Sequence, residues 1–63
     1  MSNSWKQALV NSQTEVNRAV FEMNKSYDPE KYGNPDHAYI ESTINEAIKD
    51  FMEAKKLLTN SLF

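Results

Sequence analysis

The position of the helix-breaking residues constrains this chain more than any other feature. The only glycine and both prolines of the 63 residues are Pro29, Gly33 and Pro35, and the long segments on either side contain neither residue type. Glycine and proline interrupt helical patterns more strongly than other residues. We therefore expect a single all-α domain over residues 1–63: a first helix over about 4–26, a linker over 27–35 and a second helix over about 35–60, folded as an antiparallel hairpin.

The first segment carries two rows of residues with helical spacing. Large apolar residues recur every seven positions, and a row of small residues runs beside them. The large row is Leu9, Val16 and Met23, and the small row is Ser12, Ala19 and Ser26. This spacing is typical of a helix and not of a strand. Ser2 or Ser4 is expected to cap its start, because a serine side chain can accept a free backbone N–H there.

The second segment repeats the same design. Its apolar positions keep a spacing of four and three residues: Ile40, Ile44, Ala47, Phe51, Ala54 and Leu58. Asn34 is expected to be the N-cap, with Pro35 at the first helical position, where a missing N–H costs nothing. In the linker, Asp28, Pro29 and Gly33 predict one short helical turn, with the aspartate capping it and the glycine closing it.

The two rows suggest how the helices pack. If the small rows face each other, Ala19 lies near Ala47 and Ser12 near Ala54, and the large rows share one exposed side. A chain this short rarely supplies more than ~3–5 kcal/mol from its own core, and without cysteine it has no disulfide. A second hairpin would then complete a four-helix bundle. Its core would be Leu9, Val16, Met23, Ile44, Ile48, Phe51 and Leu58.

In pattern alone, this architecture resembles the plasmid copy-number protein Rop, a dimer of short helical hairpins; the two share no motif. The resemblance therefore implies the arrangement of helices and carries over neither a function nor any functional residue. The alternative is that the apolar face of a monomer receives a helix from a different protein.

Several classes of function lack their sequence signals. The chain has one histidine, His37, and no cysteine, so no nucleophile–base pair or metal-binding pattern is visible. No glycine-rich phosphate loop is present. We therefore predict a protein that is not an enzyme and has no cofactor or metal. The net charge of −2 indicates no basic surface of the kind that binds nucleic acid. No segment reaches the length of a membrane span. The expected location is the cytoplasm.

One aromatic residue does not fit the apolar rows. Phe21 falls opposite Leu9, Val16 and Met23, among polar neighbours, and aromatic residues near an arginine are typical anchors of interfaces. The predicted partner contacts are Phe21, Arg18, Val10, Lys25 and Tyr32.

The chain is therefore predicted to be a protein-binding regulator, inhibitor or accessory subunit, with a composition like that of phage proteins. One alternative is a nucleic-acid-binding hairpin dimer, in which Arg18 and Lys25 are duplicated by a two-fold axis. The other is a structural subunit of an assembly.

Overall fold

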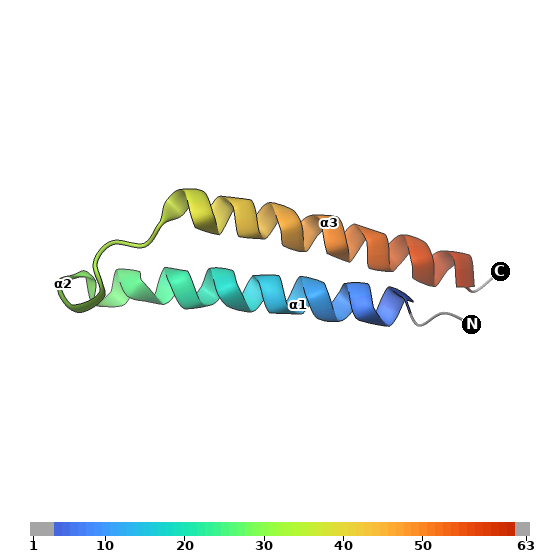
Figure 1. Ribbon diagram of the computed structural model, residues 1–63, viewed down its shortest axis with the longest axis horizontal. Helices are drawn as coiled ribbons and strands as arrows, with labels where there is room; N and C mark the ends of the chain where they lie inside the picture. The colour runs from blue at the N-terminus through green and yellow to red at the C-terminus, as the bar shows by residue number, and fades with distance from the viewer. Residues whose placement is uncertain (1–3, 62–63) are drawn as a thin grey trace.

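The computed structural model describes residues 4–61, which form two long antiparallel helices joined by a compact corner (Figure 1). In chain order the elements are α1 (Ser4–Met23), the 3-10 turn η1 (Asn24–Tyr27), α2 (Pro29–Tyr32) and α3 (His37–Ser61). The molecule is a rod with extents of 52 × 15 × 12 Å. No helix within residues 4–61 combines the length and the apolar character needed to cross a membrane. The prediction of an all-α hairpin is confirmed.

The corner is built from the capped turn that the sequence predicts. The Asp28 side chain accepts the backbone N–H of Lys31 at 3.4 Å, and Pro29 opens α2. Gly33 closes the turn with its N–H donating to the Pro29 carbonyl at 2.8 Å. Its φ of 77° lies in the left-handed region, which glycine adopts without the steric cost of a Cβ.

The start of α3 differs from the prediction. Asp36, not Asn34, is the N-cap: its Oδ1 accepts the N–H of Tyr39 at 3.0 Å, and its carbonyl accepts the N–H of Ile40 at 3.0 Å. Pro35 therefore precedes the helix and does not open it. Asp36 also donates its own N–H to the Glu22 carboxylate of α1 at 2.9 Å, and this tertiary contact links the cap to α1. For α1, Ser4 is the first helical residue, and Ser2 lies outside the described residues.

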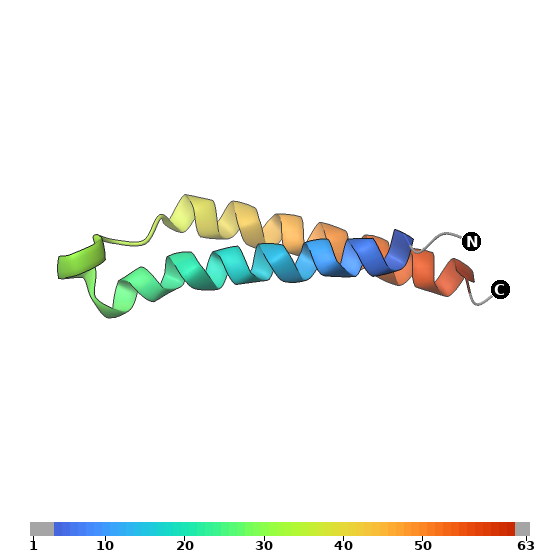
Figure 2. The same cartoon turned by 60° about the horizontal axis from the view of Figure 1, so that its bottom comes forward.

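Only small side chains are buried where α1 meets α3. We call this contact the small-residue seam; its members are Ala8, Ser12, Ala19, Thr43, Ala47 and Ala54. Figures 1 and 2 show the two helices side by side along their length. Small residues at helical spacing let two backbones approach closely. The expected meeting of the small rows is confirmed for Ser12, Ala19, Ala47 and Ala54. Ser26 of the first row remains exposed, and Ala8 and Thr43 are buried although they lie outside the predicted rows.

The register of the two helices also differs from the prediction. The Ser12 hydroxyl donates to the Ala47 carbonyl at 2.8 Å, and this is a buried bond between α1 and α3. Ser12 therefore lies against Ala47, one heptad before Ala54, with which the sequence pattern pairs it. The pattern itself cannot fix this choice, because a heptad repeat looks the same after a shift of seven residues.

Candidate functional site

An apolar groove runs along one side of the small-residue seam. Its volume is about 460 Å³. Both long helices line it: Ser12, Val16, Ala19, Val20 and Met23 from α1, and Ile40, Ile44, Ala47, Ile48 and Phe51 from α3. Its floor is the seam and its walls are the large apolar rows. A concave surface made almost wholly of aliphatic and aromatic side chains fits another apolar surface and offers little to a charged ligand.

Within residues 4–61, the large apolar residues do not form a core in the single chain. Phe51 is 54% exposed, Ile48 is 55% exposed and Val16 is 43% exposed. The other predicted core residues, Leu9, Met23, Ile44 and Leu58, are between 37% and 44% exposed. A compact chain of this length would have a radius of gyration of roughly 11 Å, whereas the hairpin has 15.0 Å. The isolated hairpin thus leaves its apolar rows in contact with water.

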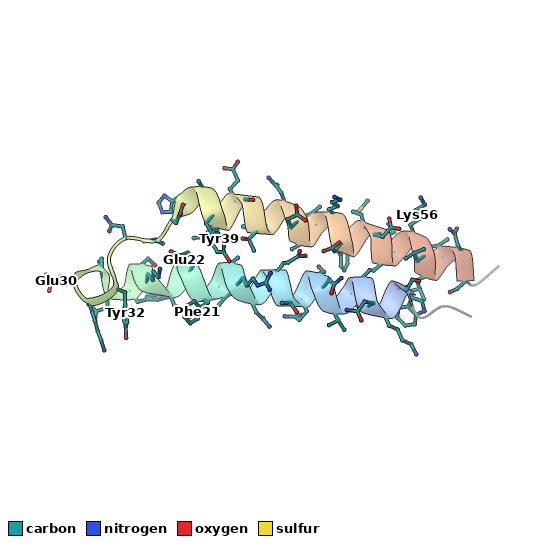
Figure 3. The ribbon with its side chains drawn as sticks, viewed as in Figure 1. Phe21, Glu22, Glu30, Tyr32, Tyr39 and Lys56 are labelled. Carbon is teal, nitrogen blue, oxygen red and sulfur yellow. The ribbon has the colours of Figure 1, made fainter. Side chains whose placement is uncertain are left out.

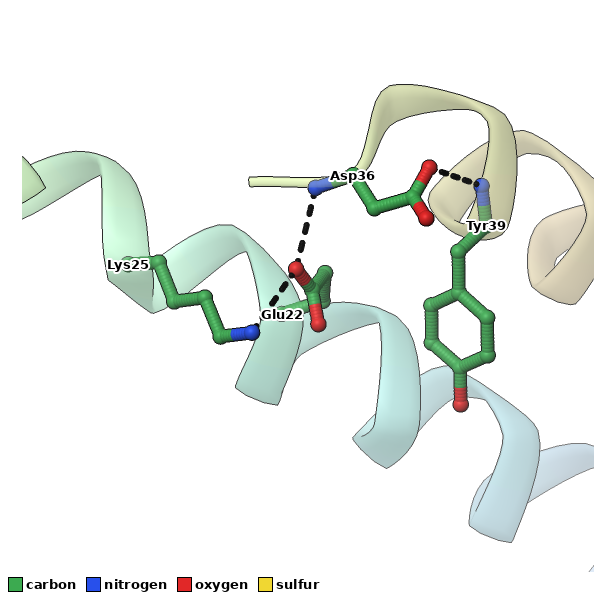
Figure 4. Close-up of polar contacts among 4 residues, drawn as sticks. All are labelled: Glu22, Lys25, Asp36 and Tyr39. Carbon is green, nitrogen blue, oxygen red and sulfur yellow. Dashed lines mark hydrogen bonds and ion pairs between the residues drawn. The ribbon is translucent and has the colours of Figure 1, made fainter. Parts of the chain in front are cut away.

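The opposite side of the seam is polar and is organised around Glu22. Its Oε2 accepts the N–H of Asp36 at 2.9 Å and lies 3.1 Å from the Lys25 Nζ (Figure 4). The hydrogen bond from Asp36, followed by the bond and charge of Lys25, lowers the pKa of Glu22 below its usual 4.5. This contact joins the end of α1 to the start of α3 and so holds the corner in place.

Three carboxylates gather farther along this polar side. Oxygen atoms of Glu15, Glu46 and Asp50 lie within 4.8 Å of one another. The Glu15 Oε1 is not accessible to water and has no hydrogen-bond partner among residues 4–61. Hydrogen bonding to Asp50, partial loss of solvation, and the negative charges of Asp50 and Glu46 raise the pKa of Glu15, while Arg18 opposes this shift.

The two perturbed carboxylates predict opposite effects of pH on stability. Because the pKa of Glu15 is raised in the fold, its ionisation weakens the fold as pH rises above the unfolded value of 4.5. Because the pKa of Glu22 is lowered, its stabilisation is complete above 4.5 and is lost as pH falls through the folded value.

We expect Glu15→Gln to raise the unfolding temperature at neutral pH and Glu22→Gln to lower it, with both differences shrinking toward pH 3–4. Thermal unfolding across this range, followed by circular dichroism, measures both variants, and each is the control for the other. If both variants changed the unfolding temperature by the same amount in the same direction, the opposite pKa shifts of Glu15 and Glu22 would be contradicted.

A second hollow lies on this polar side, and we call it the aromatic hollow. It has a volume of about 650 Å³. Its lining residues are Thr14, Asn17, Arg18, Phe21, Glu22, Lys25, Asp36 and Tyr39. Tyr39 extends from α3 toward α1, and Phe21 and Tyr32 project from the outer side of the hairpin near the corner (Figure 3). A smaller adjoining hollow is lined by Phe21, Asn24, Lys25 and Tyr32.

The structure brings four of the five predicted contact residues together. Phe21 and Lys25 line both the aromatic hollow and the smaller adjoining hollow. Arg18 lines the aromatic hollow, and Tyr32 lines the adjoining one. Phe21 is 73% exposed, which leaves its ring available for a partner. Val10 is separate: it lines a shallow hollow near the start of α1 with Ser4, Lys6 and Gln7.

Sequence reasoning missed three contributors to the aromatic hollow. Tyr39 belongs to α3 and was not among the predicted contact residues, and the contact between Glu22 and Asp36 was not predicted. Their contact joins residues 14 positions apart, so no local pattern reports it. The one available signal was Asp36 followed three residues later by Tyr39, which is the spacing of an N-cap and the N–H that it binds.

Comparisons of the chain with protein-family models, with curated proteins and with solved structures find no match.

Proposed function

We propose that this chain is a non-enzymatic protein-binding module that works as a dimer of hairpins. The observation that carries the proposal is the apolar groove, whose walls remain partly exposed in the single chain. Two hairpins packed groove to groove would bury these walls and complete a four-helix bundle. The large rows would then supply the apolar core that one hairpin lacks.

The exposed area supports a second copy as the occupant of the groove. The hairpin has an accessible surface of 5064 Å². A compact protein of its mass, 7.3 kDa, would expose roughly 4,200 Å². The excess is on the order of 900 Å², and a stable interface buries about 800 Å² on each partner. One symmetric contact between two hairpins is therefore large enough to remove the excess.

The aromatic hollow is proposed as the surface for a larger protein, with the chain acting as its regulator, inhibitor or accessory subunit. Phe21 and Tyr39 supply rigid aromatic area, which Tyr32 extends in the adjoining hollow, and such residues dominate the energetics of protein interfaces. The nearby cations are partly balanced, since Lys25 pairs with Glu22 and the Arg18 charge acts on Glu15. This balance favours a protein partner over the phosphate backbone of a nucleic acid.

Sedimentation over a concentration series tests the dimer. We expect a single two-chain species at micromolar concentration and a monomer only on strong dilution. A chain that remains monomeric at all concentrations contradicts the dimer. A species whose mass keeps increasing with concentration also contradicts the dimer, and favours an open assembly over a closed pair.

Phe21→Ala is expected to abolish capture of the partner protein from host extract while leaving the unfolding temperature within about 3 °C of the parent. The reason is that the Phe21 ring is 73% exposed and contributes little to the fold. The matched control is Tyr27→Ala, which removes a ring that is 78% exposed outside the aromatic hollow and should keep capture intact. Mass spectrometry of the captured proteins, with thermal unfolding of both variants, provides the measurement. If Phe21→Ala mainly lowers the unfolding temperature, the ring belongs to the fold and the assignment is wrong.

A further inference from the structure

The rim of the apolar groove on α3 carries two opposite charges placed symmetrically about an isoleucine. Glu41, Ile48 and Lys55 are spaced by seven residues, so they lie along one line of the helix. Ile48 lines the groove and is 55% exposed. Each charge is therefore about 10 Å from Ile48 along the helix axis, one toward the corner and one toward the open end. Within residues 4–61 neither Glu41 nor Lys55 has an ion-pair partner.

The rim on α1 adds a further charge at the open end. Lys6, Gln13 and Val20 form a similar line with a spacing of seven, and Val20 lines the groove. The start of α1 lies beside the end of α3 (Figure 1). The groove therefore has an acidic residue, Glu41, on its rim near the corner, and two basic residues, Lys6 and Lys55, on its rim at the open end.

We infer that the second copy lies antiparallel to the first, with its corner against the open end of its partner and the two-fold axis beside Ile48. This inference rests on the proposed dimer and specifies its geometry. A two-fold axis perpendicular to the rod places α3 against α3 of the second copy and α1 against α1. Ile48 then meets its own symmetry mate, and Glu41 meets Lys55 of the second copy twice.

The other closed arrangement puts both corners at the same end, and its charges conflict. With the two-fold axis along the rod, α3 faces α1 of the second copy. Lys55 then lies near Lys6 of the second copy, and Glu41 lies near Val20. Like charges in contact disfavour this arrangement. An unpaired charge beside Val20 does not separate the two arrangements, because the antiparallel one places Lys6 beside Val20 of the second copy. The charges therefore select between two orientations that the apolar rows alone would allow.

The antiparallel geometry has a consequence for the aromatic hollow. Phe21 and Tyr39 lie toward the corner of each hairpin (Figure 3), so the two hollows would lie toward opposite ends of the bundle. The dimer would thus offer two equivalent sites that face apart, which suits a bivalent contact with two partner molecules.

Single-cysteine variants test the orientation, because the chain has no cysteine of its own. Glu41→Cys and Lys55→Cys chains are mixed and treated with a short bismaleimide, and Ile48→Cys is treated alone. In the mixture, we expect Glu41→Cys chains to be cross-linked to Lys55→Cys chains. In the other sample, we expect two Ile48→Cys chains to be cross-linked to each other. Lys49→Cys, an exposed neighbour away from the groove, is the control and should remain uncross-linked.

The alternative pair is Lys55→Cys mixed with Lys6→Cys. Efficient cross-linking of this pair in place of the Glu41–Lys55 pair overturns the antiparallel arrangement while leaving the dimer intact. If sedimentation shows only monomers for the parent chain, the proposed dimer itself is wrong, and the question of its orientation does not arise.

Charge exchange gives an independent readout. Glu41→Lys should raise the dissociation constant of the dimer about tenfold, because two attractive contacts become repulsive. The double variant Glu41→Lys with Lys55→Glu should restore the parent value within about threefold, since the pairs re-form with their signs exchanged. Equal weakening by the single and the double variant would overturn the inference.

Discussion

Ala47→Leu is expected to leave the hairpin largely unfolded at concentrations where the parent chain is folded. Ala47 is 5% exposed, and its carbonyl accepts the buried bond from Ser12 at 2.8 Å. A leucine at this position of the small-residue seam would force α1 and α3 apart and break that bond. Overpacking typically costs 1–3 kcal/mol and occasionally more, so we expect a loss of about 3 kcal/mol, most of the ~3–5 kcal/mol available to so small a core.

The matched control for this substitution is Ala38→Leu. Ala38 is an exposed alanine in the same helix, and alanine and leucine have similar helix propensities. The control should therefore unfold close to the parent in urea monitored by circular dichroism. If both variants unfold at the same urea concentration as the parent, close approach of the helices is not what holds the hairpin together.

Phe51→Asp is expected to dissociate the dimer while leaving each hairpin helical. Phe51 lines the apolar groove and is 54% exposed in the single chain, so the isolated hairpin loses little when it is replaced. In the bundle the aspartate would be buried without a partner in both copies, and a cost of about 4 kcal/mol is typical of an uncompensated buried charge. One such charge alone corresponds to roughly a thousandfold rise in the dissociation constant, and the dimer would contain two.

Val10→Asp is the control for Phe51→Asp, because Val10 is 58% exposed and lies outside the groove. Sedimentation equilibrium should show the control as a dimer and Phe51→Asp as a monomer at the same concentration. Loss of dimer in both variants would point to net charge as the cause, and a Phe51→Asp dimer of normal strength would place the interface elsewhere.

Much of the fold followed from local patterns. The cluster Pro29, Gly33 and Pro35 predicted the corner, and Asp28 with Gly33 predicted the short α2 turn that the structure contains. The small rows predicted four of the residues buried between the helices, Ser12, Ala19, Ala47 and Ala54, but not Ala8 or Thr43. These features depend on a few neighbouring residues and on helical periodicity, so a single sequence carries them.

The candidate site was only partly predictable. Phe21 stood out because a large aromatic lay on a polar face, and Arg18 and Lys25 were found as its helical neighbours. Tyr39 could not be assigned to the same hollow, because it comes from α3 and approaches only through the pairing of the helices. The cluster of Glu15, Glu46 and Asp50 was missed for the same reason, since its members lie on two helices.

The sequence by itself determined that the chain forms two amphipathic helices, where they break, and that small residues line their contact, because these properties repeat at short range. The tertiary structure decided the register of the helices, the N-cap at Asp36 and the environment of Glu15. Heptad rows allow several registers of similar energy, and the bonds from Asp36 to Glu22 and from Ser12 to Ala47 hold the one observed.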